Sequence, residues 1–128
     1  GFATYQIPYS ALQRTEDNTI KTAFQSGAGT IIRGGVARGE PGIGRGGADR
    51  WHYWDKGKLD DLRSQGESRS AFLLRFTLSH PHMHTTIVGT HNPDHLAENL
   101  KTSEIGRLPQ NVYAEAKRRL AAAGQKSG

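Results

Sequence analysis

The sequence contains no cysteine, which excludes disulfide bonds and thiolate zinc sites and favours a reducing compartment. No apolar run approaches the ~20 residues that a membrane-spanning helix requires, and no stretch shows the pattern of a signal peptide. Apolar residues make up only 34% of the 128 residues, enough for one modest domain. We therefore expect a cytoplasmic protein with a single domain over residues 1–128.

The chain is rich in glycine and carries a net positive charge. The net charge of +5 permits an anionic ligand such as a phosphate, and only weakly permits nucleic acid. The glycines gather between residues 34 and 47, with arginines among them. The first residues already alternate like a strand, so we expect the chain to be a piece of a longer protein.

The order of the predicted elements indicates an α/β fold. Alternating or short apolar stretches predict strands near residues 3–8, 29–33 and 85–89. Helical periodicity with capping signals predicts helices near 15–27, 68–80, 91–100 and 108–124. A long loop rich in glycine and arginine is expected over 34–57. Three parallel βα units with a C-terminal helix are too few to close a barrel, so we expect a partial (βα)8 TIM barrel.

Three local patterns suggest other functions. "GIGRGG" at 42–47 follows no strand and opens no helix, which excludes a Rossmann turn. The Arg-Gly pairs lie between predicted core elements, which disfavours an RNA-binding segment. Five histidines flank the strand at 85–89: His80, His82 and His84 precede it, and His91 and His95 follow it. The two groups lie at opposite ends of the strand, so we expect loop histidines exposed to solvent and no shared metal site.

The aromatic residues Trp51, Tyr53 and Trp54 follow the glycines directly. They either pin the loop onto the core or line a substrate pocket, and the sequence leaves both interpretations open.

The segment "TTIVGTHNPDHLAENL", residues 85–100, reads as a strand, a polar turn and a well-capped helix start. The free backbone N–H groups at such a helix start form a site for an anion. Glu98 and Asn99 lie on the next turn, where they could hydrogen-bond the edge of a purine. An ordinary strand–helix junction remains the alternative.

The same segment resembles the last strand and helix of the aldo/keto reductases. "YQIPYSALQR" resembles the sixth barrel strand of that family, and "GAGTIIRGGVARG" resembles the seventh. The resemblance covers nearly the whole chain, in order. It implies NAD(P)H-dependent reduction of a small carbonyl substrate, with this chain supplying the cofactor-binding C-terminal part.

The resemblance also implies roles for individual residues. Gln6 would bind the nicotinamide carboxamide, and Arg33 stands where the family usually has an aromatic residue that stacks on the ring. The pyrophosphate would run along Gly34, Gly35, Val36 and Arg38. The adenosine end would be held by Thr90, His91, Asn92, His95, Glu98 and Asn99, the last two at the adenine.

Two departures from the family limit what the resemblance implies. Gly89 replaces a lysine that some members have, so the preference for NADP(H) or NAD(H) stays open. The family's Asp, Tyr, Lys and His tetrad lies on the first four strands, whereas the resemblance begins at the sixth, so no catalytic residue is assigned. The alternative function is a stand-alone oligomeric half-barrel, either a binding module or an unrelated small enzyme. For either function we expect the isolated chain to self-associate.

Overall fold

The computed structural model describes residues 4–12, 14–27, 29–33, 48–81, 85–87 and 93–125. Its elements in chain order are β1 (Thr4–Pro8), α1 (Asp17–Gln25), β2 (Gly29–Arg33), α2 (Ala48–Lys56), the 3-10 helix η1 (Leu59–Leu62), α3 (Arg69–Leu78), β3 (Thr85–Ile87), α4 (Pro93–Ile105) and α5 (Gln110–Ala122). None of these described helices is long and apolar enough to cross a bilayer.

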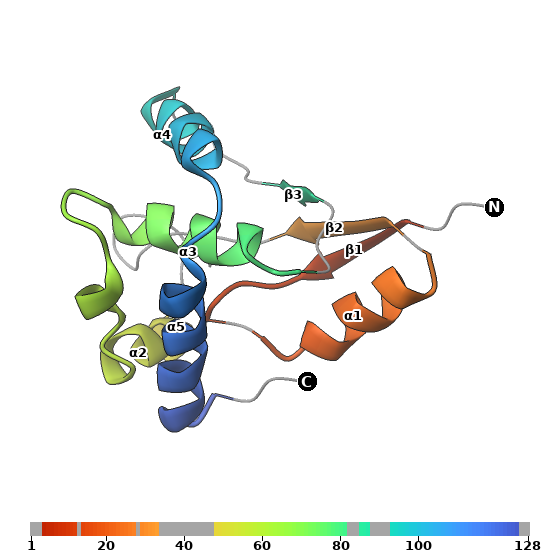
Figure 1. Cartoon of the computed structure of the whole chain (residues 1–128), viewed down its shortest axis with the longest axis horizontal. Coiled ribbons are helices and arrows are strands. Elements are labelled where there is room, and N and C mark those ends of the chain that lie inside the picture. The colour runs from red at the N-terminus through yellow and green to blue at the C-terminus, as the bar shows by residue number, and fades with distance from the viewer. Residues whose placement is uncertain are drawn as a thin grey trace.

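The strands form one parallel sheet in the order β1-β2-β3 (Figure 1). In its register Pro8 pairs with Arg33, and Arg33 pairs with Ile87, so the three carboxyl ends lie in a row. The strands occupy the ranges expected from the sequence, except that residues 3, 88 and 89 lie outside the described part. No described strand pairs with the outer edge of β1, and the expected self-association stays a prediction.

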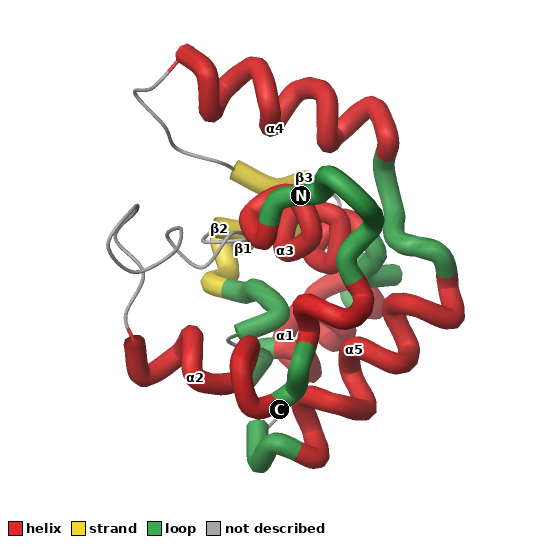
Figure 2. The backbone as a smooth tube through the Cα atoms, turned by 90° about the vertical axis from the view of Figure 1, so that its left-hand side faces the viewer, coloured by secondary structure: helices red, strands yellow, loops and turns green. Residues whose placement is uncertain are grey.

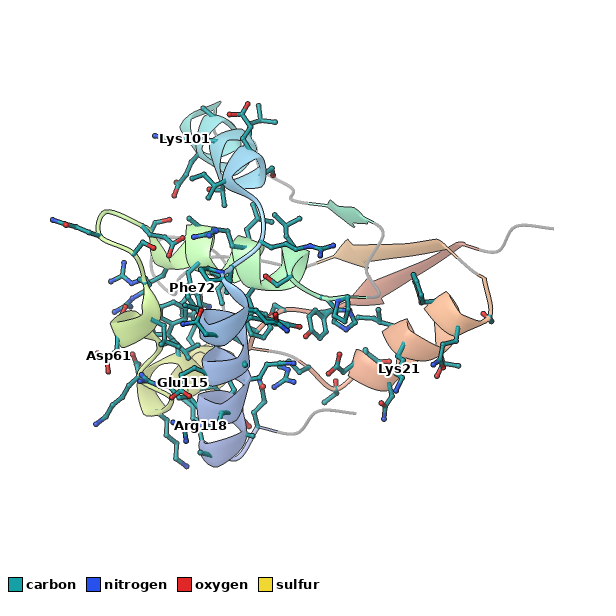
Figure 3. All side chains as sticks on the ribbon, viewed as in Figure 1. Lys21, Asp61, Phe72, Lys101, Glu115 and Arg118 are labelled. Carbon is teal, nitrogen blue, oxygen red and sulfur yellow. The ribbon has the colours of Figure 1, made fainter. Side chains whose placement is uncertain are left out.

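The helices lie in two groups around the sheet. Figure 2 shows α4 on the β3 side of the molecule, apart from α1, α2 and α5. Phe72 of α3 points into the middle of the molecule beside α5 (Figure 3), where it is fully buried. The buried cluster around it draws on most of the described elements and consists of Tyr9, Ala11, Leu12, Ile20, Trp51, Trp54, Leu59, Phe72, Leu73, Phe76, Leu108, Ala116 and Leu120. Burying a large apolar side chain contributes about 1.5–3 kcal/mol, so this cluster is the main source of stability.

The predicted loop over 34–57 is wrong over residues 48–56, because α2 occupies Ala48–Lys56, and the expectation that no helix follows "GIGRGG" is wrong for the same reason. Trp51 and Trp54 are three residues apart, so one face of this helix carries both rings into the core, where they are 5% and 0% exposed. The aromatic residues therefore pin the segment to the core, which decides between the two interpretations of them. The glycine-rich composition favours a loop, whereas the helical spacing of the two tryptophans is the signal that indicates α2.

The turn after α2 contains a backbone conformation that suits glycine better than lysine. Lys58 has φ of 52°, in the left-handed region, although Gly57 precedes it. Gly57 itself is required for close packing, because a Cβ there would lie 3.0 Å from the Tyr53 carbonyl oxygen and 3.5 Å from that of Arg119. The left-handed position therefore falls on a residue with a side chain.

We expect Lys58→Gly to raise the free energy of unfolding by roughly 0.5 kcal/mol. Relief of left-handed strain, about 1–2 kcal/mol, exceeds the entropic cost of a new glycine, about 0.4–1 kcal/mol. Urea unfolding measures the change. The matched control is Lys56→Gly in the last turn of α2, which we expect to destabilise the protein. A loss of stability in Lys58→Gly as large as in the control would contradict the strain at this position.

Candidate functional site

The two residues expected at the nicotinamide end lie on neighbouring strands. Gln6 is in the middle of β1, beside Ile31. Arg33 is the last residue of β2 and lies between Pro8 and Ile87 in the sheet. The backbone thus places Arg33 at the carboxyl edge, where ligands of parallel α/β folds bind, and Gln6 two residues further into β1 from that edge.

Seven of the expected residues lie outside the part of the chain that the structure describes: Gly34, Gly35, Val36, Arg38, Thr90, His91 and Asn92. The first group follows Arg33 and the second follows Ile87, and these two strand ends are register partners. The described strand ends that precede the two segments in the chain therefore lie at the same edge of the sheet.

The remaining three residues belong to α4, which begins at Pro93. His95 is three residues before Glu98 and four before Asn99, so all three belong to the first two turns of this helix. The start of α4 comes six residues after the end of β3. The residues expected to bind the adenosine therefore follow the end of β3 closely in the sequence.

Glu98 has a partner that the sequence analysis did not foresee. The Ser68 hydroxyl donates a hydrogen bond to Oε1 of Glu98, joining α4 to the start of α3. The Oγ of Ser68 also accepts a hydrogen bond of 3.0 Å from the backbone N–H of Ala71, and so caps α3. Capping signals in the sequence predicted a helix start near residue 68, but no local pattern reveals a contact over 30 residues.

The expectation of solvent-exposed loop histidines is wrong for His80, whose side chain is 3% exposed. His80 follows α3, and its Nε2 lies 2.6 Å from Oδ1 of Asp17 in the first turn of α1. Its ring also meets the ring of Tyr9 edge-on, at 5.1 Å between centroids. In the described ranges no three acidic or histidine side chains form a group that could hold a metal ion.

The environment shifts the pKa values of this buried cluster. Burial raises the pKa of the Tyr9 hydroxyl well above its usual range, so it stays protonated. Burial alone would also raise the pKa of Asp17, but the hydrogen bond and charge of His80, together with the charges of Arg14 and Lys117, hold it below its usual range. An aspartate–histidine pair can serve as a general base, but this histidine is closed to a substrate. The pair instead ties α1 to α3.

We expect the Asp17→Asn variant to lose less stability in acid than the wild type does. Because the folded pKa of Asp17 is depressed, its contribution is complete above the unfolded value of about 3.9 and is lost as pH falls through the folded pKa. The free energy of unfolding should therefore fall more steeply below pH 4 in the wild type than in Asp17→Asn. Urea unfolding at steps from pH 7 to pH 2 measures both slopes.

Glu115 also titrates in acid, so its effect must be separated from that of Asp17. Hydrogen bonds from Arg118 and Arg119 lower the pKa of this exposed carboxyl to about 2, so it titrates in the same range in both proteins. Subtracting one curve from the other removes its effect. Equal slopes in the wild type and the variant would contradict the role of Asp17.

Two open grooves lie on the described surface. One, of about 510 Å³, is lined by the turn before α3 and ends at Ser68; its residues are Asp60, Arg63, Ser64, Gln65, Gly66, Glu67 and Ser68. The other lies between the C-terminal ends of α2 and α5, where Figure 3 shows Asp61, Glu115 and Arg118 near one another. Its basic residues lie at the negative ends of two helices, whose dipoles they balance, which weakens it as an anion site.

The comparisons with known proteins concern the fold. No protein-family model matches the chain, and no curated protein matches it in sequence. Among solved structures, the holo form of aldo-keto reductase AKR11C1 from Bacillus halodurans is similar with a TM-score of 0.70 and 20% identity. The match covers 98% of this chain and 42% of the reductase. The chain has the fold of part of an aldo-keto reductase.

The apo form of the same reductase matches with a TM-score of 0.71 and 18% identity, covering 91% of this chain and 43% of that one. The chain thus spans less than half the length of these neighbours. The resemblance read from the sequence is confirmed at the level of the fold. Three parallel βα units in a piece of this size agree with the expected partial barrel.

Proposed function

We propose that this chain forms the cofactor-binding part of a nicotinamide-dependent carbonyl reductase. The observation that carries the proposal is the fold likeness to aldo-keto reductases over 98% of the chain, one of them solved in a holo form. The position of Arg33 at the carboxyl end of β2, with Gln6 on the neighbouring strand β1, supports it.

The residues at the expected binding positions suit a dinucleotide. Glycines at 34 and 35 have no side chain to keep a pyrophosphate from the backbone, and Arg33 and Arg38 carry charge of the right sign. The N-terminal end of α4, a 13-residue helix, favours a further phosphate through its dipole and free N–H groups. The carboxylate of Glu98 accepts a hydrogen bond from an amino group such as that of adenine.

When bound, the nicotinamide supplies the reducing equivalent for a carbonyl carbon. Gln6 would hold the carboxamide of that group, and the guanidinium of Arg33 would stack on its ring or pair with a phosphate. The resemblance assigns no member of the catalytic tetrad to these 128 residues, so we propose that the remainder of the reductase supplies the proton donor.

We expect the purified chain to bind NADPH or NADH and to reduce no aldehyde. Replacing Glu98 with alanine should weaken binding by about ten- to a hundredfold, because a hydrogen bond to a charged group contributes roughly 1.5–3 kcal/mol. Fluorescence titration with each nucleotide measures binding, and loss of nucleotide absorbance with an aldehyde present measures turnover.

The matched control is Glu104→Ala, which makes the same charge change on an exposed position of the same helix. We expect it to bind like the wild type. A chain that binds neither nucleotide would overturn the proposal. Clear aldehyde reduction would show that these 128 residues contain a proton donor of their own.

A further inference from the structure

The hydroxyl of Ser68 makes two hydrogen bonds of opposite sense. Its oxygen accepts from the N–H of Ala71, which caps α3, and its proton goes to Oε1 of Glu98 on α4. Ser68 has extended backbone geometry, with φ of −73° and ψ of 160°, as an N-cap residue requires. The cap fixes the oxygen in space, and the single proton then points in one direction.

This arrangement restrains the carboxylate of Glu98. A glutamate on a helix surface ordinarily samples many rotamers, and a ligand that binds it must stop that motion at an entropic cost. Here Oε1 is occupied by a donor that belongs to a capped helix end in the partly buried contact between α3 and α4. In the described contacts the Ser68 hydroxyl donates to Oε1, and a carboxylate has a second oxygen that can accept from a ligand.

We propose that Ser68 is a positioning residue that orients Glu98 to read the amino group of adenine in the bound nucleotide. The inference rests on the proposed function and adds to it a residue that touches no ligand. The preorganised carboxylate raises affinity because its rotamer is fixed before binding. It also raises selectivity, because a carboxylate accepts from the amino group of adenine and repels the carbonyl oxygen of hypoxanthine.

Four substitutions separate this role from helix capping. Ser68→Asp retains a good capping oxygen but has no proton to donate and repels Glu98. Ser68→Asn is its isosteric partner, which caps equally well and donates through its amide. Ser68→Thr retains both bonds, and Ser68→Gly removes the hydroxyl at only a small cost to the cap.

The measurement is a fluorescence titration with NADPH and with its hypoxanthine analogue, and the readout is the ratio of the two dissociation constants. We expect Ser68→Asp and Ser68→Gly to weaken NADPH binding about tenfold and to bring the ratio close to one. Ser68→Asn and Ser68→Thr should keep the ratio of the wild type. Thermal unfolding of each variant records the capping effect separately, and a change in capping alone leaves the ratio unaltered.

The outcomes distinguish this inference from the proposed function. If the wild type binds no nicotinamide nucleotide, the proposed function fails and the inference fails with it. If the wild type discriminates against hypoxanthine and the folded Ser68→Asp or Ser68→Gly variant discriminates equally, only the role of Ser68 is overturned. Two variants without a donor keep the test decisive should one of them fail to fold.

Discussion

Replacing Trp54 with alanine is expected to lower the free energy of unfolding by about 3–5 kcal/mol, the usual range for truncating a buried large aromatic residue. Trp54 is 0% exposed. Its ring meets Phe72 edge-on at 5.6 Å and lies 5.7 Å from the ring of Trp51. The substitution would leave a cavity where α2 and α3 meet, and rigid surroundings can close it only in part.

The effect is large in relation to the whole, because domains are stable by only about 5–15 kcal/mol. Urea unfolding followed by circular dichroism measures it, since the variant loses a fluorophore. With a slope of about 1–3 kcal/mol per molar urea, the midpoint should fall by about 2 M. Trp54→Phe, which keeps an aromatic ring, should lie between the variant and the wild type.

Asp55→Ala is the matched control on the same helix. Its side chain is exposed, so we expect a change within about 0.5 kcal/mol. If Trp54→Ala and Asp55→Ala behaved alike, α2 would not be packed on the core and residues 48–56 would belong to the glycine-rich loop after all. The experiment therefore also tests how this segment differs from the sequence-based expectation.

The elements that the sequence predicted share one property, which is that their signal is local. The strand at Gly29–Arg33 is a short apolar run between glycines, and α3 begins at a serine cap followed by apolar residues at helical spacing. Such patterns reflect φ/ψ preferences and burial within a few residues. The start of α2 carries no comparable cap signal, because glycine and arginine surround it. Only the spacing of Trp51 and Trp54 indicated a helix.

The sequence did not predict two long-range contacts between polar side chains. His80 and Asp17 are 63 residues apart, and Ser68 and Glu98 are 30 apart. Each of these side chains also has an ordinary solvent-exposed interpretation, and only the fold decides which polar groups meet. The resemblance pointed to Glu98 from its motif, but it carried no information about the partner that orients it.

Arg75 links the same helix, α3, to the other end of α4, and its removal is the second substitution from which we expect a large effect. The guanidinium donates to Oε2 of Glu67 at 2.8 Å and to the carbonyl oxygens of Gly106 and Arg107 at 3.0 Å each. The side chains of Arg75 and Glu67 are only 11% and 9% exposed. Gly106 and Arg107 form the link between α4 and α5.

Arg75→Ala is expected to destabilise the protein by about 3–5 kcal/mol, because it leaves the buried carboxylate of Glu67 without its cationic partner and two carbonyl oxygens without this donor. Urea unfolding measures the loss. Arg118→Ala is the control: Arg118 also pairs with a glutamate, but its side chain is 66% exposed, and we expect little change. Adding Glu67→Ala to Arg75→Ala should cost less than the two single changes together, because the unpaired charge is then gone.

The same variant tests whether α3 holds α4 in place for ligand binding. With the link at Gly106 and Arg107 released, α4 keeps the Ser68 contact at Glu98 but loses its anchor at the other end. Amide hydrogen exchange should therefore rise in α4 more than in α1, at a denaturant concentration where the variant remains folded. Equal exchange in both helices would show that the Arg75 cluster stabilises the fold as a whole and does not position the helix that carries Glu98 and Asn99.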